Sequence, residues 1–262
     1  YNRSLLPALK KEGLIVVESH ENMNKEQKAF ADQYFEETIY PVLTPMAMDS
    51  ARPFPLVRNK TLNIGALIAK KGKKEKEELE FATVQVPSVL PRIVEIPCQK
   101  EGKKAIILLE EIIERNIGKL FLSNQVVCTC PYRIIRNADL TIDEDEAADL
   151  LSEIQKQIKK RQWGEVIRLD VDEKMDPRLL KILKTEFHMK EEDIYAVNGP
   201  LDLTFLMKMY GLEGFEELKT SSYTPAPVPQ MMTEEDIFSQ IRRQDILLHH
   251  PYMTFNPVVD FV

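Results

Sequence analysis

The sequence predicts an α+β fold in which a mostly antiparallel sheet is flanked by helices. Strand-like and helix-like segments follow one another without strict β-α-β alternation, which disfavours a purely parallel sheet. Two alternating segments, 61–69 and 80–86, enclose a lysine-rich stretch and predict a β-hairpin with a charged tip. An apolar content of 44% and a charged content of 29% are ordinary for a globular protein, and 262 residues suffice to bury a core.

The N-terminal part of the chain predicts two helices separated by a strand. Leucines recur at helical spacing in the first segment, and β-branched residues fill the next. Asn24 with Gln27 is an N-cap pair that predicts the start of the second helix. Several prolines then exclude regular helix. The predicted elements are a helix at 1–12 closed by Gly13, a strand at 14–17, a helix at 24–38 and an ordered loop at 41–55.

Helical and strand patterns continue along the rest of the chain. Asp176 followed by Pro177 predicts a helix start, because proline suits the first helical turn. Thr233 with Asp236 predicts the cap of a last helix that runs to Arg243. The other predicted elements are helices at 106–117, 143–160, 179–187 and 201–210, and strands at 125–135, 165–170 and 193–197.

Charge and composition narrow the classes of function. The net charge is −7, whereas a protein dedicated to a polyanion usually shows a basic footprint. Any phosphate-binding surface is therefore expected to be local, formed by a few arginines from distant parts of the sequence. No apolar run approaches the roughly 20 residues that cross a bilayer. The start lacks a signal-peptide pattern and an initiator Met, which is consistent with an excised piece of a longer protein.

Metal-binding patterns are weak in this sequence. Cys98, Cys128 and Cys130 are too few for a disulfide framework, and the last two are expected to share one face of a strand. A zinc site needs four ligands, usually with wider cysteine spacing. The acidic clusters at 77–78 and 143–146 fit solvated charge better than Mg²⁺, which usually takes one or two carboxylates plus substrate phosphates. We therefore expect no metal ligand in this chain.

The segment Tyr132–Leu151 is a strand that passes through a polar turn into a helix start. Arg133 and Arg136 would point to opposite faces of a regular strand, so only a bulge or the turn would let both reach one ligand. Two interpretations remain open for Arg136. It forms an ion pair with Asp139 or Asp143, or it presents donors with Asn137 to a phosphate chain, which suits the planar guanidinium fork.

Four blocks of sequence occur together in one order. They are Tyr34–Pro45 continued by Arg52–Pro55 and Asn59, then Tyr132–Leu151, Val197–Leu203, and Asp236–Tyr252 with its Leu-Leu-His-His-Pro-Tyr ending. With these blocks the chain resembles bacterial polyphosphate kinases of the ATP-dependent, histidine-phosphorylating family. The resemblance spans nearly the whole chain. It implies a fragment with three parts: the end of an N-terminal helical domain at 1–12, a middle (head) domain at 13–222, and a linker with the start of a phospholipase D-like catalytic domain at 223–262. The proline- and serine-rich segment Thr220–Pro229 is the best boundary that the sequence itself predicts.

The resemblance also implies an activity for the parent protein. Such kinases reversibly transfer the terminal phosphate of ATP to inorganic polyphosphate through a phosphohistidine, with Mg²⁺. It implies a homodimer assembled through the head domain and a cytoplasmic bacterial protein, and it leaves peripheral association with a membrane open. Neither a nucleic-acid partner nor a membrane span is expected. The alternative is a non-catalytic interaction and assembly module.

Site residues follow from the same resemblance. The phosphorylated histidine of the family lies in a His-x-Lys motif, and the one match here, His188–Lys190, is expected to be a surface helix end. We therefore expect no catalytic residue in this chain. Arg133, Arg136 and Asn137 are the candidate polyphosphate-binding residues. The candidates for a domain seam are His249, His250 and Tyr252, with Pro251 favouring an extended strand edge at His250. The lysines at 70–76 are expected to form a solvated turn or to attract polyphosphate.

Overall fold

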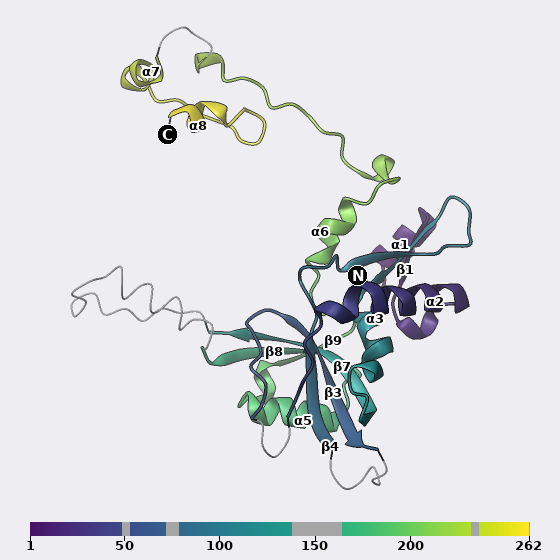
Figure 1. The fold of residues 1–262 in the computed structure, drawn as a ribbon. Helices are drawn as coiled ribbons and strands as arrows, with labels where there is room; N and C mark the ends of the chain where they lie inside the picture. Colours follow the sequence, from purple (N-terminus) through teal and green to yellow (C-terminus); the bar gives the residue numbers. More distant parts are fainter. Residues whose placement is uncertain (49–52, 72–78, 138–163, 232–235, 262) are drawn as a thin grey trace, which may run out of the picture. The chain divides into compact units, whose positions relative to one another are not determined.

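Two β-sheets organise the chain from Tyr1 to Met209 (Figure 1). The computed structural model describes residues 1–48, 53–71, 79–137, 164–231 and 236–261. The chain divides into two compact units, Tyr1–Met209 and Tyr210–Val262, each of which is treated by itself below. The domain limits expected from sequence, after residues 12 and 222, remain predictions. No helix among the described residues is both long and apolar enough to cross a bilayer.

The sheets are mainly antiparallel, as predicted. Within the described residues the larger sheet has the order β2-β4-β3-β7-β8-β9, and only the β8–β9 pair is parallel. The smaller sheet has the order β1-β6-β5, with β1 and β6 parallel. The strands are β1 (Leu14–Val17), β2 (Met46–Ala47), β3 (Leu62–Lys70), β4 (Leu79–Gln85), β5 (Ile93–Ile96), β6 (Lys104–Leu108), β7 (Asn124–Arg136), β8 (Val166–Asp172) and β9 (Ile194–Val197).

Short helices connect and cover these strands, which completes the predicted α+β class. The helices of the larger unit are α1 (Leu5–Lys11), η1 (His20–Asn22), α2 (Lys25–Tyr34), the π-helical turn η2 (Phe35–Ile39), η3 (Tyr40–Val42), α3 (Leu109–Asn116), η4 (Ile117–Lys119), α5 (Pro177–Glu186), η6 (Glu191–Asp193) and α6 (Phe205–Tyr210), whose last residue begins the smaller unit. The smaller unit contains η7 (Glu216–Leu218), η8 (Pro229–Met231), α7 (Ile237–Arg243) and α8 (Asn256–Phe261).

Strand β3 lies at the centre of the core because both of its faces are buried. Ile64 and Ile68 belong to a cluster that includes residues of α2, η2 and α3. Leu67 belongs to a second cluster with Tyr132 and residues of α5. Successive side chains of β3 point to opposite faces, and both faces are buried, so the strand separates the two clusters. Gly65 is confined here, since an added Cβ would lie 3.4 Å from the rings of Phe81 and Tyr132.

Local signals in the sequence predicted local structure correctly. Gly13 ends α1 with φ at 93°, a conformation that glycine adopts readily. Asn24 and Gln27 form a complete capping box at the start of α2. Asp176 caps α5, and Asp236 caps α7, while Thr233 lies outside the described residues. The predicted hairpin is β3 paired with β4, and most of its charged tip lies outside the described residues.

Other predictions were wrong where tertiary pairing decides. The helix predicted at 106–117 is the strand β6 up to Leu108, followed by α3 from Leu109. A short apolar run fits either structure, and pairing with β1 and β5 selects the strand. Strand β5 was not predicted, and the helix predicted at 201–210 begins only at Phe205. A further helix, α8, follows α7. The helix predicted at 143–160 lies outside the described residues.

Candidate functional site

Arg136 holds a loop against the end of β7. Its Nε and Nη2 donate to the carbonyl oxygen of Val57 at 3.3 and 3.0 Å, and its Nη1 donates to the carbonyl oxygen of Gly164 at 2.8 Å. Its backbone N–H donates to Oδ1 of Asn59 at 2.9 Å. Burial lowers the pKa of the Arg136 guanidinium, which nevertheless stays protonated at physiological pH. Arg136 is therefore a cross-link between backbone segments.

Arg133 acts at the other end of the same loop. Its Nε donates to the carbonyl oxygen of Lys60 at 3.3 Å, and its guanidinium lies 3.8 Å from the carboxylate of the buried Asp170. The backbone N–H of Lys60 donates to the carbonyl oxygen of Ile134 at 2.9 Å. The segment Val57–Lys60, which we call the anchored loop, is thus attached to β7 at both ends. Two of the sequence blocks, one around Asn59 and one around Arg136, meet here.

The third candidate, Asn137, is exposed at the end of β7. Its backbone N–H donates to the carbonyl oxygen of Glu165 at 2.7 Å, which joins the residue after β7 to the residue before β8. A register shift between Ile135 and Arg136 interrupts the regular pairing with β8. Asp139 and Asp143, the expected ion-pair partners of Arg136, lie outside the described residues, so that interpretation remains a prediction.

The candidates His249, His250 and Tyr252 lie in the smaller unit and form a turn. The backbone N–H of Met253 donates to the carbonyl oxygen of His249 at 2.8 Å, and Nδ1 of His250 lies 3.1 Å from the Met253 carbonyl oxygen. The strand edge expected at His250 is therefore wrong, because a turn hydrogen bond takes the place of ladder pairing. Aromatic contacts join His249 to Tyr252 at 5.0 Å, His250 to Phe255 at 5.0 Å and Tyr223 to Tyr252 at 5.9 Å between ring centroids.

A cavity of about 280 Å³ in the larger unit is acidic. Part of its wall is the segment Asn198–Leu201, which belongs to the third sequence block. Lys174 also lines the cavity. Because acidic side chains outnumber basic ones along this wall, the cavity suits a cation better than a phosphate. The carboxylates that line it are those of Glu18, Glu110, Glu111, Asp172 and Glu173.

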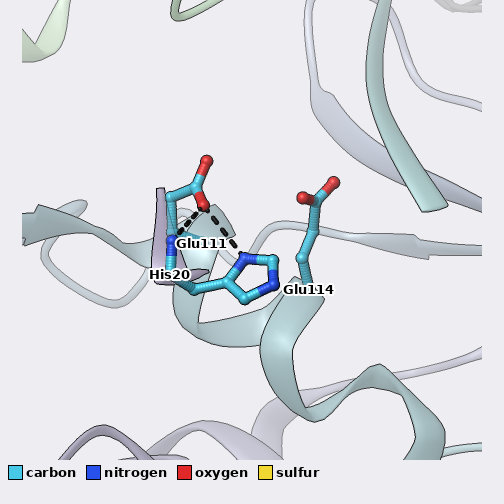
Figure 2. A group of neighbouring side chains, drawn as sticks. All are labelled: His20, Glu111 and Glu114. Atoms are coloured by element: carbon cyan, nitrogen blue, oxygen red, sulfur yellow. Dashed lines mark hydrogen bonds and ion pairs between the residues drawn. The ribbon is translucent and has the colours of Figure 1, made fainter. Parts of the chain in front are cut away.

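Beside this cavity, His20, Glu111 and Glu114 form a cluster of potential metal ligands (Figure 2). One ligand atom from each residue lies within 4.8 Å of the other two. Glu111 and Glu114 lie on the same face of α3 because they are three residues apart, and His20 begins η1. The backbone N–H of His20 donates to Oε2 of Glu111 at 2.8 Å, and Nδ1 of His20 lies 3.1 Å from the same oxygen.

Glu114 is the unusual member of this cluster. Its Oε1 is inaccessible to solvent and has no hydrogen-bond partner among the described residues. Burial raises the pKa of Glu114 to about 8, and the nearby carboxylates of Glu111, Glu110 and Asp172 raise it as well. Without a cation the carboxyl group is therefore largely protonated at neutral pH.

Glu110, on the same helix, has a full set of partners. Arg92 donates through Nε to both carboxylate oxygens at 3.1 Å and through Nη2 to Oε1 at 2.6 Å. Nη1 of Arg92 donates to the carbonyl oxygen of Asp202, and the guanidinium lies 5.1 Å from the ring centroid of Phe205. This bidentate pair links the start of α3 to the third sequence block.

Sequence reasoning did not select His20, Glu111 or Glu114. The spacing of the two glutamates on a predicted helix was visible, but acidic pairs on exposed helix faces are common. Their meeting with His20 depends on the parallel register of β1 and β6, which sets Val17 beside Ile107 and so brings the following segments together. No local pattern in the sequence encodes this register.

Comparisons with known proteins agree with the fold and the sequence blocks. The family profile described as the polyphosphate kinase middle domain matches residues 26–209. A polyphosphate kinase of Halalkalibacterium halodurans is 43% identical across 100% of this chain, which covers 37% of that protein. One of Lactiplantibacillus plantarum is 44% identical, with 100% of this chain and 36% of that protein covered.

A solved structure shows the same fold. The crystal structure of polyphosphate kinase from Porphyromonas gingivalis superposes with a TM-score of 0.73 at 22% identity, covering 100% of this chain and 37% of that one. The chain thus spans little more than a third of the length of the relatives it matches. The profile match over most of its length shows that the chain belongs to the polyphosphate kinase middle-domain family.

Proposed function

We propose that this chain is the head-domain part of a polyphosphate kinase that reversibly transfers the terminal phosphate of ATP to inorganic polyphosphate. The observation that carries the proposal is the alignment of the whole chain with little more than a third of proteins named polyphosphate kinase. ATP, polyphosphate and Mg²⁺ are then substrates and cofactor of the longer protein. In this proposal the longer protein is a cytoplasmic bacterial enzyme.

The chain itself is proposed to lack the phosphorylated nucleophile. His188, which matches the His-x-Lys letters, is exposed just after α5 with φ at 54°. Its Nδ1 lies 2.8 Å from the carbonyl oxygen of Thr185, as expected for a residue that terminates a helix. This environment offers it an ordinary structural role, and covalent phosphoryl transfer requires an activated nucleophile.

In place of chemistry, we assign the chain to assembly and to the support of the polyphosphate path. Strand β9 pairs only with β8 among the described strands, so its outer edge presents backbone groups that a second copy can pair with. Tyr195 on this strand is 46% exposed. A homodimer is the assembly that these features and the family resemblance support. The alternative is a non-catalytic interaction and assembly module. It shares this assembly role, and it differs in that the longer protein would have no kinase activity.

Arg133, Arg136 and Asn137 are proposed to act through the anchored loop. Both guanidinium groups donate to backbone carbonyl oxygens of that loop, so they fix its shape first. A polyphosphate chain would then meet the loop and the exposed Asn137 together. His249, His250 and Tyr252 are proposed to pack at the seam with the catalytic domain.

The decisive experiment compares this chain with the longer protein that contains it. Both are incubated with labelled ATP and Mg²⁺, and polymer formation and acid-labile phosphohistidine are measured. We expect polymer from the longer protein and neither product from residues 1–262. A labelled histidine on the short chain, or no polymer from the longer protein, would overturn the proposal. Sedimentation at micromolar concentration tests the dimer separately, and a species heavier than 30.3 kDa is expected.

A further inference from the structure

We propose that His20, Glu111 and Glu114 form a binding site for a divalent transition-metal ion, of the Zn²⁺ or Mn²⁺ type. The proposal concerns this chain alone and does not depend on the reaction of the longer protein. It also differs from the Mg²⁺ expected with ATP, because an imidazole donor suits transition metals, whereas Mg²⁺ prefers oxygen ligands and bound water.

The distances are close to those that one ion would impose. Donors about 2.1 Å from a shared ion lie roughly 3.0 to 3.4 Å from one another in octahedral or tetrahedral geometry. Nδ1 of His20 and Oε2 of Glu111 already lie 3.1 Å apart. The whole set lies within 4.8 Å, so a side-chain rotation of Glu114 would complete the triangle. Figure 2 shows the side chains of Glu111 and Glu114 on either side of the imidazole of His20.

Glu114 supplies the second and independent observation. A buried carboxyl oxygen without a partner is rare, since polar atoms removed from water normally find hydrogen bonds. A cation at this position would give Oε1 a ligand bond in place of the missing hydrogen bond. It would also offset the repulsion among Glu111, Glu110 and Asp172, all of which act on Glu114.

The surroundings favour the same occupant. The backbone N–H of His20 fixes the Glu111 carboxylate, in the way that outer hydrogen bonds orient metal ligands. The acidic cavity that Glu111 lines would attract a cation and supply water as further ligands. The bound ion would connect η1, which follows β1, to α3, which follows β6.

The test measures binding to chain 1–262 freed of metal by a chelator. Calorimetric titration with ZnCl₂, MnCl₂ and MgCl₂ gives stoichiometry and affinity, and the thermal unfolding midpoint Tm is followed in parallel. We expect one Zn²⁺ or Mn²⁺ per chain, a rise in Tm on binding, and weaker binding of Mg²⁺. Glu114→Gln and His20→Ala should each weaken binding by about 10-fold or more.

Matched variants separate this site from others. Glu95→Gln changes an exposed carboxylate of β5 and should leave the affinity unchanged. The double variant His249→Ala/His250→Ala removes the two adjacent imidazoles of the smaller unit and should also leave the affinity unchanged. Glu114→Gln keeps the shape of the side chain and is expected to fold. A cooperative unfolding transition of this variant, measured without metal, checks that it does.

Three results would overturn the proposal. The first is no binding of Zn²⁺ or Mn²⁺ to the wild-type chain. The second is equal affinity in Glu114→Gln, His20→Ala and the wild type. The third is binding that disappears only in the His249→Ala/His250→Ala variant. In each case the cluster would be an ordinary contact of His20 with Glu111 beside a protonated Glu114.

Discussion

Glu110 and Glu114 lie one helical turn apart on α3, but their surroundings differ. Glu110 is 5% exposed and accepts three hydrogen bonds from Arg92. Glu114 has an inaccessible oxygen without a hydrogen-bond partner among the described residues, and burial raises its pKa to about 8. A buried carboxylate is thus tolerated either by a matched cation or by keeping its proton. The contrast teaches that burial alone does not set the charge of a residue, because the partner does.

The largest effect is expected from removing the partner of Glu110. Arg92→Met leaves a buried carboxylate uncompensated, which costs about 3 to 5 kcal/mol of unfolding free energy. Urea unfolding of the chain measures this loss. The double variant Arg92→Met/Glu110→Leu should recover much of it, because two apolar groups of similar size need no pairing. A double variant no more stable than Arg92→Met would contradict the importance of the pair.

The second prediction is that substituting Glu114 stabilises the protein, whereas removing the partner of Glu110 destabilises it. In a chelating buffer, Glu114→Gln should stabilise the protein at pH 8.5 and be nearly neutral at pH 4. The folded pKa of Glu114, about 8, is raised above its ordinary value of 4.5. Below 4.5 the residue is protonated in both states, so stability is unaffected. As pH rises toward 8, the unfolded chain releases the proton first, and stability falls by up to about 2 to 4 kcal/mol.

Chemical unfolding at the two pH values checks this prediction. For Glu95→Gln, at an exposed position, the difference in unfolding free energy from the wild type should be nearly the same at both pH values. If Glu114→Gln is as stable as the wild type at both pH values, the carboxyl group is solvated and the contrast with Glu110 fails.

Arg136 extends the comparison to a cation. Among the described residues, its guanidinium donates to backbone carbonyl oxygens and to no carboxylate. Arg136→Lys keeps the charge but loses the fork that bonds Val57 and Gly164, and we expect a loss of about 1 to 2 kcal/mol. The Tm of the longer protein measures it. Arg58→Lys, at an exposed position of the anchored loop, and Lys73→Ala should change Tm little.

Polyphosphate affinity separates a structural role of Arg136 from contact with phosphate. A fall in Tm alone favours a structural role, through the backbone cross-link or the predicted ion pair with Asp139 or Asp143. A fall in affinity at unchanged Tm favours direct contact with the phosphate chain. If Arg136→Lys changes neither quantity, the cluster at the end of β7 has neither role.

Sequence reasoning succeeded where the relevant contacts are local. The capping box of Asn24 and Gln27, the cap of Asp176 and the β3–β4 hairpin all depend on neighbours in the chain. It failed at β6, where an apolar run fits two structures and distant strands choose between them. The family blocks identified the middle domain. They did not show that Arg92 would meet Glu110, because that pair depends on the path of the chain between β5 and α3.

The smallest effect on stability is expected at Glu111, the third acidic residue of α3. Its partner His20 and its own side chain are 26% and 20% exposed, so water screens their interaction. Without metal, His20→Ala should therefore cost only about 0.2 to 1 kcal/mol, the range of solvent-accessible ion pairs. Urea unfolding in chelating buffer measures it, with Glu111→Gln as the reciprocal change. A cost above about 2 kcal/mol would show that the His20–Glu111 contact is buried in effect. Glu111 would then belong with Glu110 as a carboxylate that needs its partner, and the comparison along α3 would have only two classes.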